Sequence, residues 1–109
     1  MLGEFEYVLI TTAAALGESA YGVAIREQIE LVIKRKCSMG ALYTTMDRLE
    51  EKGLLRTWVG EATPQRGGRG KRMVRVTAPG LRAAKELYDA VLRVSRGASW
   101  AEHRMESTL

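Results

Sequence analysis

Apolar and small side chains recur with a helical period in several stretches of the chain. Between residues 4 and 16 the spacing is i, i+3, i+4, i+7, i+8 and i+11, which is one helical stripe. The stripe consists of Phe5, Val8, Leu9, Thr12, Ala13 and Leu16. Because Ile10 and several alanines fall outside it, this helix is apolar nearly all round and is expected to be buried on two sides. Similar spacings predict a second helix over about 20–34, with Ile25, Ile29 and Val32 facing inward, and a third over 38–52.

After the third helix the period of the pattern changes to that of strands. Leu55, Thr57 and Val59 alternate with polar or bulky neighbours over residues 54–60, and a second alternating segment occupies residues 71–77. The ten residues between them hold Pro64 and three glycines, which excludes regular structure there. The pattern predicts an antiparallel hairpin between the third helix and a final helix that Thr77 caps. The expected fold class is α+β, mainly α: a winged helix-turn-helix followed by a C-terminal dimerisation helix.

The third helix has two different faces. Its buried stripe is Leu42, Met46 and Leu49, at i, i+4 and i+7, with Ser38 as the N-cap and Gly53 as the terminator. The opposite face presents Gly40, Tyr43, Thr44, Asp47 and Arg48. An α-helix that carries small and polar residues fits the major groove of duplex DNA. Residues 39–52 are therefore predicted to be a recognition helix.

The hairpin concentrates the positive charge of the chain. The 109 residues carry a formal net charge of +4, and five cations with no acid lie between Arg66 and Arg75. Four of these five (Arg66, Arg69, Lys71 and Arg72) are interpreted as DNA contacts of a basic wing, residues 61–72. Arginine is favoured in minor grooves that A·T-rich sequence narrows, and lysine and arginine also bind phosphates. A charged loop that merely increases solubility is the alternative interpretation.

The final helix predicts a second subunit. Its apolar stripe is wider than a domain of this size can cover by itself, and consists of Leu81, Ala84, Leu87, Tyr88, Val91 and Leu92. We divide the chain into a DNA-binding part, residues 1–78, and a C-terminal dimerisation helix and tail, residues 79–109, in one compact domain. The predicted dimer interface consists of Phe5, Val8, Leu87, Tyr88, Val91 and Leu92.

Several classes of protein are excluded by what the sequence lacks. One cysteine, Cys37, allows neither an internal disulfide framework nor a multi-cysteine metal site. No apolar run reaches the roughly 18–20 residues of a membrane span, so a cytoplasmic protein without a membrane partner is expected. No nucleophile–base set, metal-ligand cluster or P-loop is present, since the glycine-rich segment 66–70 lacks the Gly-Lys-Ser/Thr element. Neither an enzyme nor a bound cofactor or metal is expected.

The order and spacing of short motifs resemble the PadR-like transcriptional regulators, specifically the short members without a large C-terminal domain. The matching pieces are Leu2-Gly3-Glu4-Phe5-Glu6, Tyr21-Gly22, Gly40-Ala41-Leu42-Tyr43, Asp47-Arg48-Leu49-Glu50, Lys52-Gly53-Leu54, Arg66-Gly67-Gly68-Arg69, Lys71-Arg72, Val76-Thr77 and Gly80. They cover about residues 2–85, and each is weak alone while the ordered set is specific. Met46 and Val74 depart from the residues commonest in the family. The resemblance implies a homodimeric winged-helix DNA-binding protein, usually a repressor, with the last helix forming the dimer.

The predicted DNA contacts outside the wing lie on the third helix. Ser38, Met39 and Gly40 are at its N-terminus, where free N–H groups and the helix dipole attract phosphate. The Tyr43 hydroxyl suits a phosphate and the Thr44 side chain suits a base edge. Arg48 is interpreted equally as a DNA contact or as an ion-pair partner of Glu51. Asp47 would repel phosphate unless it were paired, so it is expected to orient a nearby cation.

Some alternatives remain open at the level of sequence. Trp100 either packs in the partner's core or lines a pocket for a flat ligand. Cys37 lies just before the third helix, where its oxidation would disturb DNA binding, but Lys36 alone is thin support for an activated thiolate. The functional alternatives to a repressor are an adaptor that holds a partner protein and a sensor that binds small apolar effectors in the dimer core. The sequence names neither the operator nor the role of residues 97–109.

Overall fold

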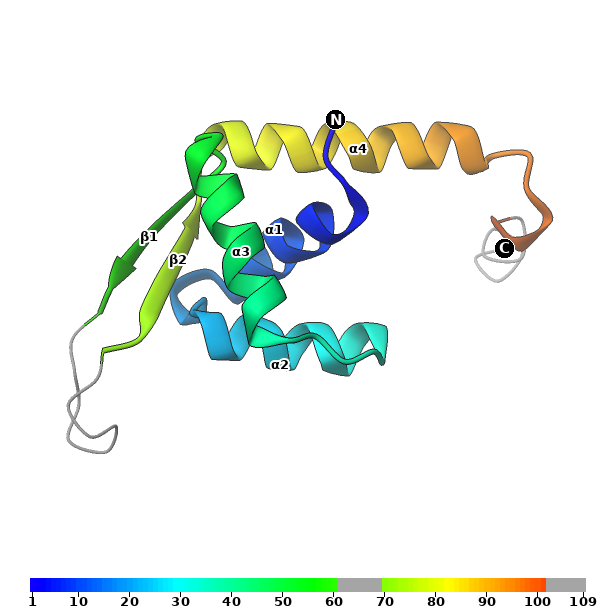
Figure 1. Ribbon diagram of the computed structural model, residues 1–109. Coiled ribbons are helices and arrows are strands. Elements are labelled where there is room, and N and C mark those ends of the chain that lie inside the picture. The colour runs from blue at the N-terminus through cyan, green and yellow to red at the C-terminus, as the bar shows by residue number, and fades with distance from the viewer. Residues whose placement is uncertain (61–69, 102–109) are drawn as a thin grey trace.

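The computed structural model describes residues 1–60 and 70–101. Within them the chain forms α1 (Glu4–Leu16), the short 3-10 helix η1 (Gly17–Ser19), α2 (Gly22–Ile33), α3 (Met39–Glu51), β1 (Leu55–Val59), β2 (Arg72–Val76) and α4 (Ala78–Ser95). Helices α1, α2 and α3 form a bundle, with the β1–β2 hairpin at one end and α4 lying across α1 (Figure 1). The predicted class, mainly helical with a two-stranded antiparallel sheet in a winged-helix arrangement, is confirmed.

The core lies between the three-helix bundle and the base of the hairpin. It consists of Leu9, Ile10, Ala13, Ala20, Ile25, Ile29, Cys37, Leu42, Met46, Leu49, Leu55 and Val74. The predicted stripe of α3 is confirmed, since Leu42, Met46 and Leu49 are fully buried. The buried face of α1 differs from the prediction: Ile10 is fully buried, whereas Phe5 and Val8 are only partly buried.

The buried face of α1 includes a charged residue, Glu6. Its side chain is buried on the same face as Ile10 and Ala13. There Glu6 Oε1 accepts a hydrogen bond from the Gly3 N–H at 2.9 Å, and Oε2 accepts one from Lys52 Nζ at 3.0 Å. A buried carboxylate is tolerated when it is paired and hydrogen-bonded in this way. The Gly3 N–H bond, followed by the Lys52 charge, holds the pKa of Glu6 below its usual value although burial opposes this.

One face of the two-stranded hairpin lies toward α3. Leu55 pairs with Val76, Thr57 with Val74 and Val59 with Arg72. Because side chains alternate along a strand, these six residues lie on the same face of the hairpin. Strand β2 is also attached to the segment before α2: the Val74 N–H donates to the Ala20 carbonyl at 3.0 Å, and Tyr21 forms a β-bridge with Met73. The base of the hairpin is thus fixed to the helices on two sides.

Helix α4 is mostly outside the core. The Thr77 hydroxyl caps it by accepting from the Gly80 N–H at 3.1 Å, as predicted. Gly80 is buried directly against the Leu54 carbonyl, and the helix then packs on α1 before extending past it (Figure 1). The radius of gyration of 16.1 Å exceeds the ~13 Å typical of a compact chain of about 100 residues.

The last turn of α2 corrects a second prediction. Val32 was expected to face inward, yet 64% of it is exposed, and its neighbour Leu31 is 70% exposed. The buried positions of α2 end at Ile29, so its last turn extends beyond the helices that cover the rest. Helical periodicity locates a stripe but does not say where along it the neighbouring helix stops.

Candidate nucleic-acid interface

The polar face of α3 is presented to solvent as the sequence predicted. Ser38 caps the helix, with its Oγ accepting from the Ala41 N–H at 3.1 Å. Gly40, Thr44 and Arg48 are all exposed. Met39 differs from them because its side chain is only partly exposed and packs against the core. Two turns of α3 therefore offer small and polar groups to a partner on one side.

Tyr43 is held by the helix before it. A side-chain carbon placed on Gly22, the first residue of α2, would lie 2.6 Å from Tyr43 Oη and 2.8 Å from its Cε1. The ring therefore occupies the space that Gly22 leaves open, and Tyr43 is half-buried. A DNA contact by Tyr43 would come from the exposed edge of a ring whose position α2 determines.

Arg72 of the wing strand is paired with α3. Its Nη2 donates to Asp47 Oδ1 at 2.6 Å and to Thr57 Oγ1 at 3.3 Å, and lies 3.7 Å from Glu50 Oε1. The guanidinium carbon also lies over the Tyr43 ring, 5.4 Å from its centroid. The expectation that Asp47 orients a nearby cation is confirmed, and that cation is Arg72.

Glu50 ties α3 to strand β1, a role that the sequence did not suggest. Its Oε2 accepts from the Thr57 N–H and its Oε1 from the Thr57 hydroxyl, each at 2.8 Å. The Thr57 hydroxyl, with help from the Thr57 N–H and Arg72, lowers the pKa of Glu50. In the sequence Glu50 was part of the motif Asp47-Arg48-Leu49-Glu50, with no role of its own. The only sequence signal was its place one helical turn after Asp47, beside a strand with a hydroxyl.

Lys71, the other described wing cation, packs on the residue before α2. Its Nζ lies over the ring of Tyr21, 4.3 Å from the centroid. Each of the two described wing cations thus contacts an aromatic ring, Lys71 that of Tyr21 and Arg72 that of Tyr43, and a cation–π contact contributes roughly 0.5–1 kcal/mol at exposed sites. Arg66 and Arg69, the other predicted wing contacts, lie outside the described residues.

A basic segment that was not among the predicted DNA contacts precedes α3. Lys34, Arg35 and Lys36 are exposed and connect α2 to the N-terminus of α3. Arg35 approaches Glu4 at 3.9 Å, with both side chains mostly exposed. Lys34 ends α2 in the left-handed region, with φ of 63°. The signal was present in the sequence as three consecutive cations, which end two positions before Ser38.

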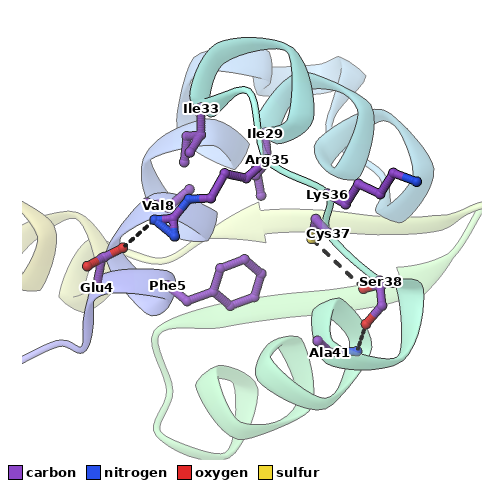
Figure 2. Close-up of a pocket in the computed structure, with 10 residues that line it drawn as sticks. All are labelled: Glu4, Phe5, Val8, Ile29, Ile33, Arg35, Lys36, Cys37, Ser38 and Ala41. Atoms are coloured by element: carbon purple, nitrogen blue, oxygen red, sulfur yellow. Dashed lines mark hydrogen bonds and ion pairs between the residues drawn. The ribbon is translucent and has the colours of Figure 1, made fainter.

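A groove of about 460 Å³ opens between α1, the end of α2 and the start of α3 (Figure 2). Phe5, Val8 and Ile33 form part of its apolar lining, and Arg35 and Lys36 lie at it as well. Phe5 and Val8, which are predicted dimer contacts, are partly buried and line this groove. The predicted dimer surface of α1 is therefore one wall of the groove. Cys37 also lines it but is only 7% exposed.

The environment of Cys37 does not favour thiolate chemistry. Burial, followed by the charge of Glu30, raises the pKa of its thiol above the usual value. The Cys37 N–H donates to Glu30 Oε2 at 2.7 Å, which places that carboxylate next to the residue. A reactive thiol needs the opposite shift, so the pKa argues against the redox interpretation.

The apolar face of α4 is largely uncovered. Tyr88 (51%), Val91 (53%) and Leu92 (48%) are all about half exposed, and Leu87 is less so. Trp100, beyond the end of α4, is 80% exposed and so is not packed into the core of its own chain. Side chains of this size rarely line up on a solvent-facing helix without a partner.

Within residues 1–60 and 70–101, no helix is both long and apolar enough to cross a membrane. The same residues contain no cluster of three or more histidine, cysteine, aspartate or glutamate side chains with the geometry to hold a metal ion.

Known proteins of similar fold are winged-helix regulators. A PadR-like transcription factor from Bacteroides fragilis superposes with a TM-score of 0.70 at 20% identity, covering 89% of this chain and 88% of that one. A PadR family transcriptional regulator from Eggerthella lenta gives 0.67 at 24% identity, with coverages of 90% and 85%. F93 from the virus STIV, a winged-helix DNA-binding protein, gives 0.67 at 21% identity, with coverages of 86% and 94%. Among curated proteins, no sequence matches this chain.

The sequence also matches a family model over most of its length. The model describes the transcriptional regulator PadR-like family, and the match runs from residue 13 to residue 97. It therefore includes the end of α1, α2, α3, the hairpin and all of α4. Members of this family are transcription regulators and not enzymes. The chain belongs to the PadR-like family of transcriptional regulators.

Proposed function

We propose that this protein binds a specific DNA operator as a homodimer and represses transcription from it. The observation that carries the proposal is the polar face of α3. Gly40, Thr44 and Arg48 stand exposed along one side of a helix whose other side is fully buried. In the major groove such a helix would present Thr44 and Arg48 to base edges, with Gly40 allowing close approach of the sugar-phosphate backbone.

Basic residues at both ends of this helix support DNA rather than a protein as the partner. The cations Lys34, Arg35 and Lys36 lie before its N-terminus, where N–H groups also favour phosphate. The wing lies beside its other half and carries Lys71 at its base. Ser38 and Tyr43 are proposed phosphate contacts, as are Arg66 and Arg69 in the wing.

Dimer formation is supported by the uncovered apolar surfaces. Helix α4 carries Tyr88, Val91 and Leu92 half exposed, and the groove beside α1 exposes parts of Phe5 and Val8. Burial of about 1,200–2,000 Å² in total is usual for a stable interface, and a helix of 18 residues together with α1 offers surface of that order. A two-fold dimer would place its two recognition helices one or more turns of DNA apart, at about 34–36 Å per turn.

A small-molecule effector is an additional proposal that rests on Trp100. Its indole is 80% exposed beyond α4, so in a dimer it would be available to a flat apolar compound. Such an effector would act by favouring one spacing of the two recognition helices. The alternative adaptor function has no comparable support, because the cations beside α3 suit a polyanion.

The first test is selection from a randomised 30-base-pair duplex library with the full chain, followed by fluorescence anisotropy on the enriched duplex and on a scrambled one. Specific binding is typically about 10³-fold or more tighter than non-specific binding. Enrichment of one sequence with a preference of that size is expected. Equal binding of both duplexes would reject sequence-specific recognition, and binding of neither would favour the adaptor.

A further inference from the structure

Arg72 occupies an unusual position for a wing cation. Most of its side chain is covered, with 28% exposed, and it lies on the face of the hairpin that meets α3. One nitrogen, Nη2, reaches Asp47 and Thr57 within hydrogen-bond distance and Glu50 at 3.7 Å. These three partners belong to α3 and β1, while Arg72 itself begins β2. A single guanidinium therefore connects the recognition helix to both strands of the wing.

The planar guanidinium also stacks on α3. It lies over the ring of Tyr43, which Gly22 in turn holds against α2. The contact with the ring uses a property that distinguishes arginine from lysine, a flat cation that stacks on aromatic rings. Rotation of the wing relative to α3 would break these contacts together.

The charges on α3 explain why this connection matters for DNA. Asp47 lies on the exposed face of the recognition helix, with 65% of its side chain exposed. An unpaired carboxylate there would repel the phosphates that α3 must approach. Arg72 neutralises Asp47 only while this ion pair is intact. If the Arg72 side chain turned to a DNA phosphate instead, the Asp47 carboxylate would be left unpaired on the face of α3 that is proposed to meet DNA.

We infer that Arg72 is a positioning residue, which sets the wing against the recognition helix and neutralises Asp47, and that it does not itself bind a phosphate. The inference rests on the proposed function, because the consequence of correct positioning is sequence-specific binding. Loss of Arg72 should reduce discrimination between operator and other DNA, whereas removal of a phosphate-binding side chain would weaken binding to every duplex alike.

A double-mutant cycle with Asp47→Asn and Arg72→Gln tests this. The probes are the enriched duplex from the selection above and a scrambled duplex. The measured quantity is the specificity ratio, the dissociation constant for the scrambled duplex divided by that for the enriched duplex. Arg72→Gln should lower this ratio by about tenfold, and Asp47→Asn should lower it too. The ratio for the double variant should be no lower than that for Arg72→Gln. Residues in contact are energetically coupled, and such coupling free energies correspond to changes of several-fold or more in a dissociation constant.

The salt dependence of the double variant separates the two roles. Asp47→Asn together with Arg72→Gln removes one charge of each sign and leaves the net charge unchanged. If Arg72 is internally paired, the slope of log K against log salt on the scrambled duplex stays at the wild-type value. If Arg72 instead binds a phosphate, the magnitude of the slope should fall by about 0.9 for each phosphate that the variant no longer neutralises. That decrease, or additive effects in the cycle, would overturn the inference.

Arg75→Gln is the matched control. Arg75 belongs to the same strand, is exposed, and pairs with Arg56 on the face of the hairpin away from α3. Its replacement removes the same charge, but the specificity ratio should be unchanged, and its effect should add to that of Asp47→Asn. A fall in the ratio as large as that of Arg72→Gln would mean that removing any wing charge reduces specificity, which also contradicts the inference.

Folding and the proposed function are checked independently. Thermal unfolding of each variant must remain cooperative, and faster amide exchange at the strand N–H of Thr57 in Arg72→Gln should accompany the loss of specificity. Unchanged exchange at Thr57 would count against a positioning role. If wild-type protein enriches no sequence, the proposed function itself fails, and that result precedes any variant.

Discussion

The α-carbon of Gly22 and the ring of Tyr43 lie in direct contact between α2 and α3. A side-chain carbon added to Gly22 would fall 2.6 Å from Tyr43 Oη, well inside contact distance. The contact fixes the ring over which the Arg72 guanidinium stacks. A glycine at the start of α2 thereby determines the position of a side chain on α3.

Gly22→Ala should displace the Tyr43 ring. Overfilling a well-packed contact typically costs about 1–3 kcal/mol. The free energy of unfolding in urea should fall by an amount at the lower end of that range, since the atoms that must move are the outer end of a half-buried side chain. Tyr43→Ala should abolish the penalty, because the alanine at position 22 then meets no ring. A full penalty in the double variant would show that the strain arises elsewhere.

Gly40→Ala should have the opposite effect on stability. No atom lies within 4 Å of a side-chain carbon at this exposed position in α3, and alanine is favoured over glycine inside a helix by about 1 kcal/mol. The urea midpoint should therefore rise, while operator affinity falls, if the backbone of the DNA approaches Gly40. A stabilised variant with unchanged affinity would remove Gly40 from the proposed interface.

Lys34→Gly should stabilise the protein. Lys34 ends α2 with φ of 63° and donates its N–H to the Glu30 carbonyl at 2.9 Å. The left-handed conformation costs a residue with a side chain roughly 1–2 kcal/mol, while glycine adopts it freely. Part of this gain is offset because glycine also makes the unfolded chain more flexible. We expect a rise in unfolding free energy of about 0.5–1 kcal/mol, and no rise for Lys36→Gly.

Glu50→Gln should change the pH dependence of stability. The Thr57 hydroxyl and N–H bind the ionised carboxylate and hold its pKa below the usual value. The stabilisation is therefore present above the unfolded pKa of about 4.3 and is lost as the pH falls through the lower folded value. At pH 7 the variant should be less stable than the wild type, and the gap should narrow below about pH 4. A gap that is constant from pH 7 to pH 3 would exclude the charge as its cause.

Leu92→Glu should dissociate the proposed dimer. Leu92 is about half exposed on the apolar face of α4, and a buried unpaired carboxylate is strongly unfavourable. Sedimentation velocity at micromolar concentration should show a dimer for the wild type and a monomer for the variant. Arg93→Glu introduces the same side chain at the neighbouring exposed position and should remain dimeric. A monomeric wild type would reject the dimer.

The elements of the fold were predictable because they depend on neighbouring residues. The period of apolar positions changes from that of a helix to that of a strand at Leu54, and Ser38 and Thr77 mark helix starts through bonds to residues three positions later. The errors have a common origin. The buried face of α1 and the exposure of Val32 depend on which helix lies alongside, and a single stripe does not contain that information.

The sequence by itself determined the order of helices and strands, the polar face of α3, and the family resemblance, because each of these resides in residues a few positions apart. Only the tertiary structure decided what the charged groups do. Arg72 meets Asp47 across 25 positions and Lys52 meets Glu6 across 46. Pairing at such distances along the chain requires that packing first bring the elements together. A cation in a basic wing therefore looks the same in sequence whether it binds phosphate or a neighbouring helix.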